Sequence, residues 1–139
     1  MVRSVEAVLA VLAASAVTWW VAGDLSESAG EDRMLDLAWA RENAVVIGLA
    51  GLVALVVCGR ALLRSASTTS GAASTIGLAI GAGVILGLGL RVLTARTIGA
   101  NIGGGGFMFV GLPVVAVLTI LAIIGAALTG RSEQGERQS

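Results

Sequence analysis

The sequence predicts an all-α membrane protein, a four-transmembrane-helix bundle with Gly/Ala-rich helix packing. The first observation is composition: 56% of the 139 residues are hydrophobic and 13% are charged, which is more apolar than a typical soluble domain. The second is that charges cluster and leave segments of membrane-spanning length almost free of them. The expected spans are about 6–22, 43–59, 74–90 and 107–129. They form one transmembrane domain over 1–129, and a polar, disordered tail is expected over 130–139.

The first segment, residues 6–22, has two interpretations. A small-x-small pattern ending at Ala16 fits the cleavage site of a secretory signal peptide, and cleavage there would leave three spans. The apolar run, however, continues past that point to Trp19 and Trp20, a pair typical of a membrane–water interface. We therefore expect an uncleaved spanning helix, with both tryptophans in an interfacial belt.

An acidic connection over residues 24–42 joins the first two spans. Apolar residues in its second half recur at helical spacing, which predicts a short interfacial helix running into the next span. Trp39 is expected to mark the water boundary there. The second span, 43–59, is stopped by Arg60 and Arg64.

The third segment is the stretch around which we expect the bundle to be organised. It follows a small, polar run over 65–73, which predicts a flexible loop. Two small-x-x-x-small pairs lie in the segment, and such pairs let helix backbones approach closely in lipid. The pairs are Gly77 with Gly81 and Gly83 with Gly87. Sequence does not decide between packing within one chain and association with another chain.

The last segment is preceded by four consecutive glycines, Gly103–Gly106. On propensity alone this run excludes a regular helix before the span begins at Phe107. Pro113 removes a backbone donor, so it should kink the span or mark its first turns.

A candidate anion contact combines the glycine run with two preceding arginines. Successive glycine N–H groups that lead into a helix can form an anion-binding nest, and nearby arginines would strengthen it. The residues expected to contact an anionic headgroup are Arg91, Arg96, Asn101, Gly103 and Gly104. The alternative is a flexible interfacial loop whose arginines pair with the acidic connection on the same side of the membrane.

Charged residues are absent from the middle of all four expected spans. Proton relays and ion-coupled transport usually need such residues inside the membrane. Glu6 is the nearest carboxylate, and we expect it to be an interfacial side chain near Arg3 or Arg64.

These observations favour a non-enzymatic protein, a structural or accessory membrane subunit that acts through helix–helix association. The chain has no His, all its basic residues are Arg, and Cys58 is its single cysteine, so common catalytic, cofactor and metal-ligand patterns are missing. A net charge of zero gives no indication of a nucleic-acid partner. The expected partners are the lipid bilayer and either a second copy or another membrane protein. The alternative function is a small oligomeric transporter or channel.

Four spans place both termini on one side of the membrane. The arginines on that side are Arg3, Arg60, Arg64, Arg131 and Arg137, and those on the other are Arg33, Arg41, Arg91 and Arg96. The excess of one predicts cytoplasmic termini by the positive-inside rule. An amino-acid composition rich in Ala, Val, Leu, Gly and Arg is typical of a high-GC bacterial genome. For a bacterial multi-pass protein, the expected location is the cell membrane.

Overall fold

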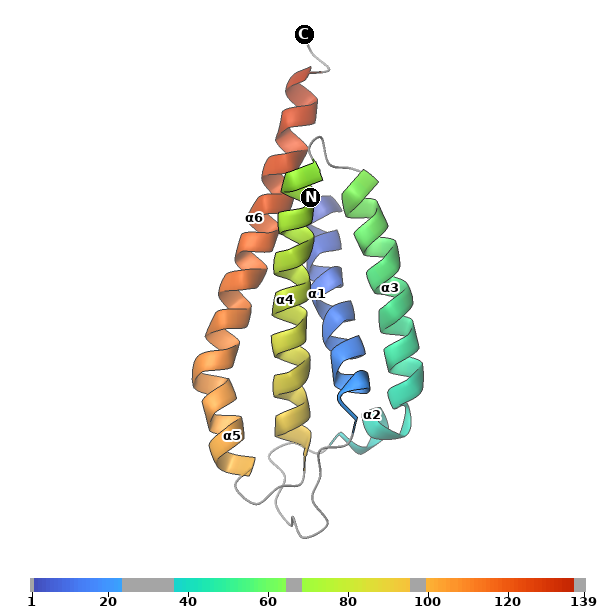
Figure 1. Cartoon of the computed structure of the whole chain (residues 1–139), viewed down its shortest axis with the longest axis vertical. Coiled ribbons are helices and arrows are strands. Elements are labelled where there is room, and N and C mark those ends of the chain that lie inside the picture. Colours follow the sequence, from blue (N-terminus) through green and yellow to red (C-terminus); the bar gives the residue numbers. More distant parts are fainter. Residues whose placement is uncertain (1, 24–36, 65–68, 96–99, 137–139) are drawn as a thin grey trace.

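Figure 1 shows the computed structural model of the chain, in which the long helices run roughly along one axis. The structure describes residues 2–23, 37–64, 69–95 and 100–136. Within these ranges the chain forms helices and contains no strand, which confirms the predicted all-α class.

The helices follow the predicted order of spans. Their bounds are α1 Val2–Val21, α2 Ala38–Glu42, α3 Ala44–Arg64, α4 Thr69–Thr94, α5 Ala100–Gly106, the π-helix η1 Phe107–Gly111, and α6 Leu112–Glu136. Among the described residues, four stretches are long and apolar enough to cross a membrane: Arg3–Val21, Ala44–Arg64, Ala73–Thr94 and Ile102–Leu128. Each overlaps one predicted span.

Helices α1 and α4 form the central pair of the bundle. Helix α3 packs mainly on α1, and α6 packs on α4 and α1, so α3 and α6 flank the pair (Figure 1). The N-terminal end of α1 and the C-terminal end of α6 lie at the same end of the bundle, whereas α2 and α5 lie at the other. The third predicted span is therefore central as expected, but it shares the centre with the first.

Close contact between α1 and α4 depends on one of the predicted glycine pairs. A Cβ added at Gly83 would lie 2.5 Å from the Val11 carbonyl oxygen, and one at Gly87 would lie 2.5 Å from the Ser15 carbonyl oxygen. The backbones are therefore too close for any side chain at either position. Alanine fills much of the remaining core, at Ala7, Ala10, Ala13, Ala14, Ala79, Ala82, Ala122 and Ala126.

The outer helices α3 and α6 also approach the central pair through glycine, at Gly51 in α3 and at Gly125 in α6. A Cβ at Gly51 of α3 would lie 3.0 Å from the Ala13 carbonyl oxygen of α1. A Cβ at Gly125 of α6 would lie 2.7 Å from the Thr75 hydroxyl oxygen of α4. Small residues thus set the helix spacing at each of these interfaces, as expected where lipid removes the hydrophobic drive for helix association.

The glycine run before the last span is helical, so the prediction that excluded a helix there is wrong. Helix α5 includes Gly103–Gly106 and continues through η1 into α6. Glycine propensities are measured in water, but in lipid the backbone must satisfy its hydrogen bonds internally, and a helix does so. The last span consequently begins at Ile102 instead of Phe107.

The π-helix accommodates the proline that follows it. The Pro113 ring would clash with the carbonyl of the residue four positions earlier, Phe109, in a regular α-helix. That residue lies inside η1, where the Leu112 N–H donates to the Phe107 carbonyl oxygen five residues earlier. The predicted perturbation by Pro113 therefore appears as a π-turn on its N-terminal side.

Two helix boundaries differ from those predicted. Helix α4 begins at Thr69, within the run 65–73 that was expected to be a loop; residues 65–68 lie outside the described residues. Helix α6 continues to Glu136, although a disordered tail was expected over 130–139. In both cases a formed apolar helix extends cheaply into polar residues, because each added residue gains one backbone hydrogen bond.

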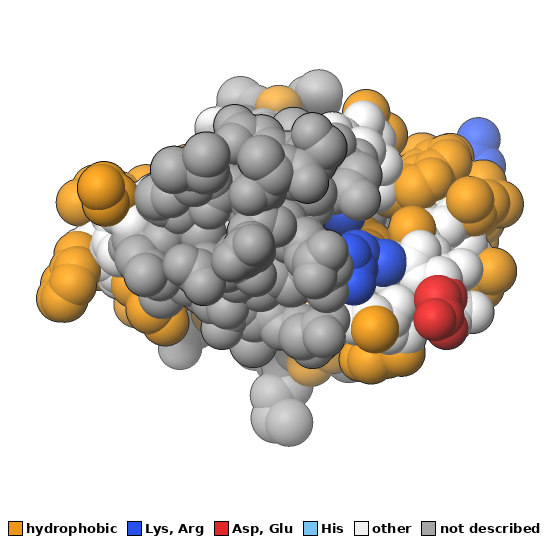
Figure 2. All heavy atoms as spheres, turned by 90° about the horizontal axis from the view of Figure 1, so that it is seen from below, with side chains coloured by type: hydrophobic (Ala, Val, Ile, Leu, Met, Phe, Trp, Pro, Cys, Tyr) orange, Lys and Arg blue, Asp and Glu red, His pale blue; other side chains and the backbone are white. Residues whose placement is uncertain are grey.

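Large aliphatic side chains cover the outside of α3 and α6. Those exposed include Val45, Val46, Leu49, Leu52, Val53, Val56, Val57 and Leu63 on α3, and Val114, Val117, Ile120, Leu121, Ile124 and Leu128 on α6. Seen from the end that carries α2 and α5, hydrophobic side chains project from the sides of the bundle (Figure 2). This distribution suits a lipid-facing surface.

Candidate functional site

Arg91, one of the predicted headgroup-contact residues, is buried at the end of the bundle that carries α2 and α5. It lies in the last turn of α4 and is 6% exposed. Its Cζ atom lies 4.8 Å from the centroid of the Trp19 ring on α1. Because both side chains are largely removed from solvent, this cation–π contact is of the desolvated, stronger kind.

The Trp19 ring is also connected to α4 by a hydrogen bond. Its Nε1–H donates to the Thr94 hydroxyl oxygen, with 3.5 Å between the two heavy atoms. The Thr94 hydroxyl in turn donates to the Leu90 carbonyl oxygen at 2.9 Å, one turn earlier in α4. Trp19, Arg91 and Thr94, which we call the arginine cluster, therefore join α1 to α4.

The other predicted headgroup residues are only partly brought together with Arg91. Arg96 lies outside the described residues, and Asn101 lies in α5, where its side chain is not described. A Cβ at Gly103 would lie 3.1 Å from Val92 Cγ1, so α5 packs beside the end of α4. Gly104 is buried.

The residues of the predicted glycine nest belong to helix α5. Because Gly103–Gly106 belong to α5, the N–H groups of Gly104, Gly105 and Gly106 point along the helix toward carbonyls four residues earlier. The N–H groups of the first turn of α5, which include that of Gly103, have no carbonyl four residues earlier in this helix, so an anion contact there stays a prediction. The anionic-headgroup contact of Arg91 and Arg96 stays a prediction.

The tryptophans differ in a way that sequence did not indicate. Trp39 is 64% exposed, as expected for an interfacial residue. Trp19 is buried in the arginine cluster, and the Trp20 ring fills the space that a side chain at Gly48 of α3 would need. Trp19 and Trp20 therefore pack α1 against its neighbours at the end of the first span, and their interfacial position stays a prediction. For Trp20 the sequence does contain a signal of this packing, the glycine at position 48 that makes room for its ring.

Glu6 and Cys58 lie near each other at the opposite end of the bundle. Cys58 of α3 is buried, and the Glu6 carboxylate of α1 is close enough to act on it electrostatically. The Glu6 Oε2 atom is buried and makes no hydrogen bond with any described residue. Glu6 is thus an ionisable group within the first apolar span, Arg3–Val21.

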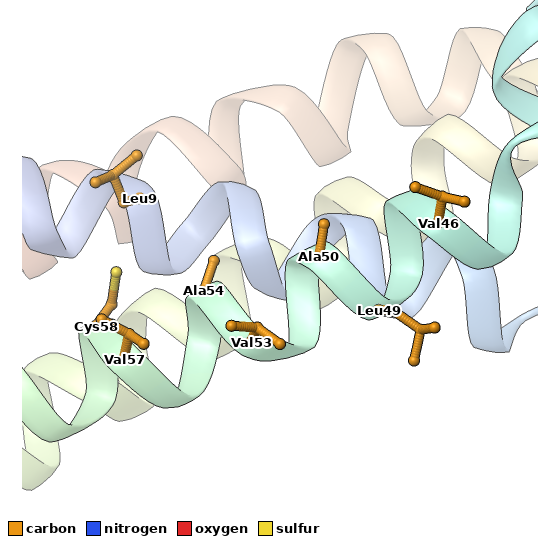
Figure 3. Close-up of a pocket in the computed structure, with 8 residues that line it drawn as sticks. All are labelled: Leu9, Val46, Leu49, Ala50, Val53, Ala54, Val57 and Cys58. Atoms are coloured by element: carbon orange, nitrogen blue, oxygen red, sulfur yellow. The ribbon is translucent and has the colours of Figure 1, made fainter.

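A shallow groove runs along α3 beside α1, and it has a volume of about 730 Å³. Figure 3 shows its lining, in which Leu9 of α1 faces a row of α3 side chains. The α3 residues are Val46, Leu49, Ala50, Val53, Ala54, Val57 and Cys58. All these side chains are apolar or, for the thiol, weakly polar. We call this feature the α3 groove.

Comparison with known proteins adds no functional assignment. No family model matches the chain, and neither a curated protein nor a solved structure matches it. Among the described residues no group of three or more His, Cys, Asp or Glu side chains is placed to hold a metal ion. The fold and its apolar helices define a small multi-pass membrane protein with four spanning helices.

Proposed function

We propose that this protein is a non-enzymatic structural or accessory membrane subunit that acts by helix–helix association. The partner is a second copy of the chain or another membrane protein, and the protein resides in the cell membrane with cytoplasmic termini. The proposal rests on Gly77 and Gly81, the glycine pair of α4 that is not in contact with another described helix of the bundle.

The supporting observation is the open space at Gly77 and Gly81. A Cβ added at either position would meet no atom of the described residues within 4 Å beyond the neighbouring backbone of α4 itself, and Gly77 is exposed. Ala73 lies one turn earlier and is also exposed, so small residues recur every four positions on this face of α4. In lipid such a row lets another helix approach closely. We call Ala73, Gly77 and Gly81 the α4 outer face.

The test is to block the α4 outer face with bulky side chains. The variant G77I/G81I should lose the membrane protein, or the second copy, that co-purifies with the tagged full-length chain in mild detergent. The variant G59I is the matched control, because a Cβ at Gly59 also meets no atom within 4 Å but lies on α3. Circular dichroism in detergent checks that both variants keep wild-type helix content.

Two results would contradict the proposal. One is a wild-type chain that purifies alone and migrates as a monomer after crosslinking in native membranes. The other is a complex that G77I/G81I and G59I retain equally.

Glu6 favours the second candidate, a small oligomeric transporter or channel. Glu6 lies one turn inside the first span, Arg3–Val21, and its buried Oε2 atom makes no hydrogen bond with described residues, which supports a role for this carboxylate at one end of a transport path. Solute or ion flux into liposomes that contain the purified protein, abolished by E6Q, would select this candidate. Equal flux in protein-containing and protein-free liposomes would eliminate it.

The proposed orientation has its own test. Reporter fusions at each terminus, one active in the cytoplasm and one active outside it, should both report cytoplasmic termini. An external signal from either end would reverse this part of the proposal.

A further inference from the structure

We propose that the α3 groove holds an acyl chain of an anionic phospholipid whose phosphate is bound by Arg60 and Arg64. This site is separate from the headgroup contact predicted at Arg91, because Arg91 lies at the opposite end of the bundle from Arg60 and Arg64. It is also independent of the α4 outer face, so the two proposals can fail separately.

The groove has the length and chemistry of a site for an acyl chain. Its α3 lining runs from Val46 to Cys58, and at 1.5 Å per residue this is about 18 Å, enough to cross one leaflet of the hydrocarbon core. The floor is formed by Ala50 and Ala54, whose small side chains leave the hollow, and Leu9 borders it from α1 (Figure 3). A flexible hydrocarbon chain is complementary to such an uncharged, shallow surface.

Two arginines, Arg60 and Arg64, lie beyond one end of this groove, on the face of α3 that lines it. Val46, Ala50, Val53 and Val57 follow each other at intervals of three or four residues, which places them on one face of the helix. The same spacing continues from Val57 to Arg60 and then to Arg64. Both arginines are exposed. An amphiphile with a long apolar chain and a negative head fits this sequence of surfaces.

Arginine is suited to the proposed headgroup. Its guanidinium can donate two parallel hydrogen bonds to phosphate oxygens, and its position at the end of a span matches the headgroup level. The end of the bundle that carries Arg60 and Arg64 also carries the N-terminal end of α1 (Figure 1). With the proposed cytoplasmic termini, this is the leaflet in which anionic lipids attract basic residues.

A second protein helix suits the groove less well. Helices that pack closely in lipid do so through small residues, whereas the exposed groove margins are Val46, Leu49, Val53 and Val57. The carboxylate of Glu6 would oppose a phosphate, but Arg60 and Arg64 outnumber it at this end of α3.

The experiment measures lipid bound to the full-length protein. The chain is reconstituted in vesicles of equal amounts of phosphatidylglycerol and phosphatidylcholine and extracted in mild detergent, and the retained lipids are quantified by mass spectrometry. The wild-type protein should retain phosphatidylglycerol over phosphatidylcholine by roughly thirtyfold, as expected from about 1 kcal/mol for each of two basic residues at the membrane surface.

Two variants separate the headgroup contact from the chain contact. R60Q/R64Q should reduce the preference to near one, and R60K/R64K should keep most of it because the charge remains. A50W should reduce the retention of both lipids by filling the groove floor. L52W is its matched control, because Leu52 is exposed on α3 but does not line the groove.

Three outcomes would overturn the proposal. The first is a lipid preference that is the same in R60Q/R64Q as in the wild type. The second is equal lipid retention by A50W and L52W. The third is efficient disulfide crosslinking of V53C, in a C58S background, to a second copy in the vesicles, because the groove would then be covered by protein. Elution volume in detergent and helix content confirm that each variant is folded.

Discussion

The two glycine pairs of α4 look alike in sequence and have opposite surroundings in the structure. At Gly83 and Gly87 an added Cβ would lie 2.5 Å from backbone oxygens of α1. At Gly77 and Gly81 it would meet no atom within 4 Å from any other helix that the structure describes. One pair is therefore required for the fold of the chain, and the other is available for a contact outside it.

The difference teaches that a small-x-x-x-small pair identifies a surface for close approach but not the helix that uses it. Successive pairs on one helix are rotated relative to each other, because six residues separate Gly77 from Gly83 and a helix turns every 3.6 residues. They therefore lie on different faces. Neighbouring helices decide which face is covered.

Removing the first part of α1 should cause the largest loss of folding stability among the changes that test this difference between the glycine pairs. A chain that begins after Ala16 would leave Gly83 and Gly87 as open as Gly77 and Gly81, and it would lose the helix on which α3, α4 and α6 pack. We expect the loss of the whole folding stability, roughly 5 kcal/mol or more. The intact mass of the membrane-extracted protein should accordingly include residues 1–16. A mature chain starting at Val17 that forms a stable bundle would contradict this expectation.

Filling the packed pair should have the next largest effect. G83V and G87V should each lower the free energy of unfolding by about 3 kcal/mol, because the new side chain meets α1 backbone that cannot rotate away. Helix content followed by circular dichroism during titration of mild detergent with a denaturing one measures this loss. G59V, at an open position, serves as the control and should stay close to the wild type. Equal unfolding of all three variants would refute the packing argument.

The arginine cluster should contribute less than the glycine contacts. R91Q removes the desolvated cation–π contact with Trp19 and should lower the free energy of unfolding by about 2 kcal/mol. W19F keeps a ring beneath Arg91 but loses the long hydrogen bond to Thr94, so about 0.5 kcal/mol is expected. The same titration measures both variants. A larger loss in W19F than in R91Q would show that the hydrogen bond, and not the ring contact, joins the helices.

Alanine at the open pair should have the smallest effect on folding. An alanine side chain at Gly77 or Gly81 would meet no atom of another described segment, so G77A and G81A should each leave the free energy of unfolding within about 0.5 kcal/mol of the wild type. Unfolding of the monomeric chain in detergent tests this. A fall of about 1 kcal/mol or more would place the open pair inside the bundle and remove the basis for the α4 outer face.

The glycine run shows where sequence reasoning failed and why. Propensities from aqueous peptides predict that Gly103–Gly106 break the helix, yet they form α5. The backbone there follows the solvent requirement of lipid, where an unpaired N–H costs more than the conformational freedom of glycine.

The candidate sites were only partly predictable. Arg91 was singled out from sequence, but its contact with Trp19, at a distance of 72 positions along the chain, was not. Nor was the alignment of Arg60 and Arg64 with the α3 groove, although the three- and four-residue spacing that produces it can be seen in the sequence. One side of the groove is formed by Leu9 of α1, so the sequence of α3 alone does not predict the groove.

The sequence by itself determined the solvent, the helical class and the number of spans, because these depend on the apolar length of each segment. The tertiary structure alone decided that α1 shares the centre with α4, that Gly83 and Gly87 are covered, and that Gly77 and Gly81 are not. The physical reason is that apolar length is a local property of the chain. The rotation of one helix against another depends instead on which small residues meet across the interface.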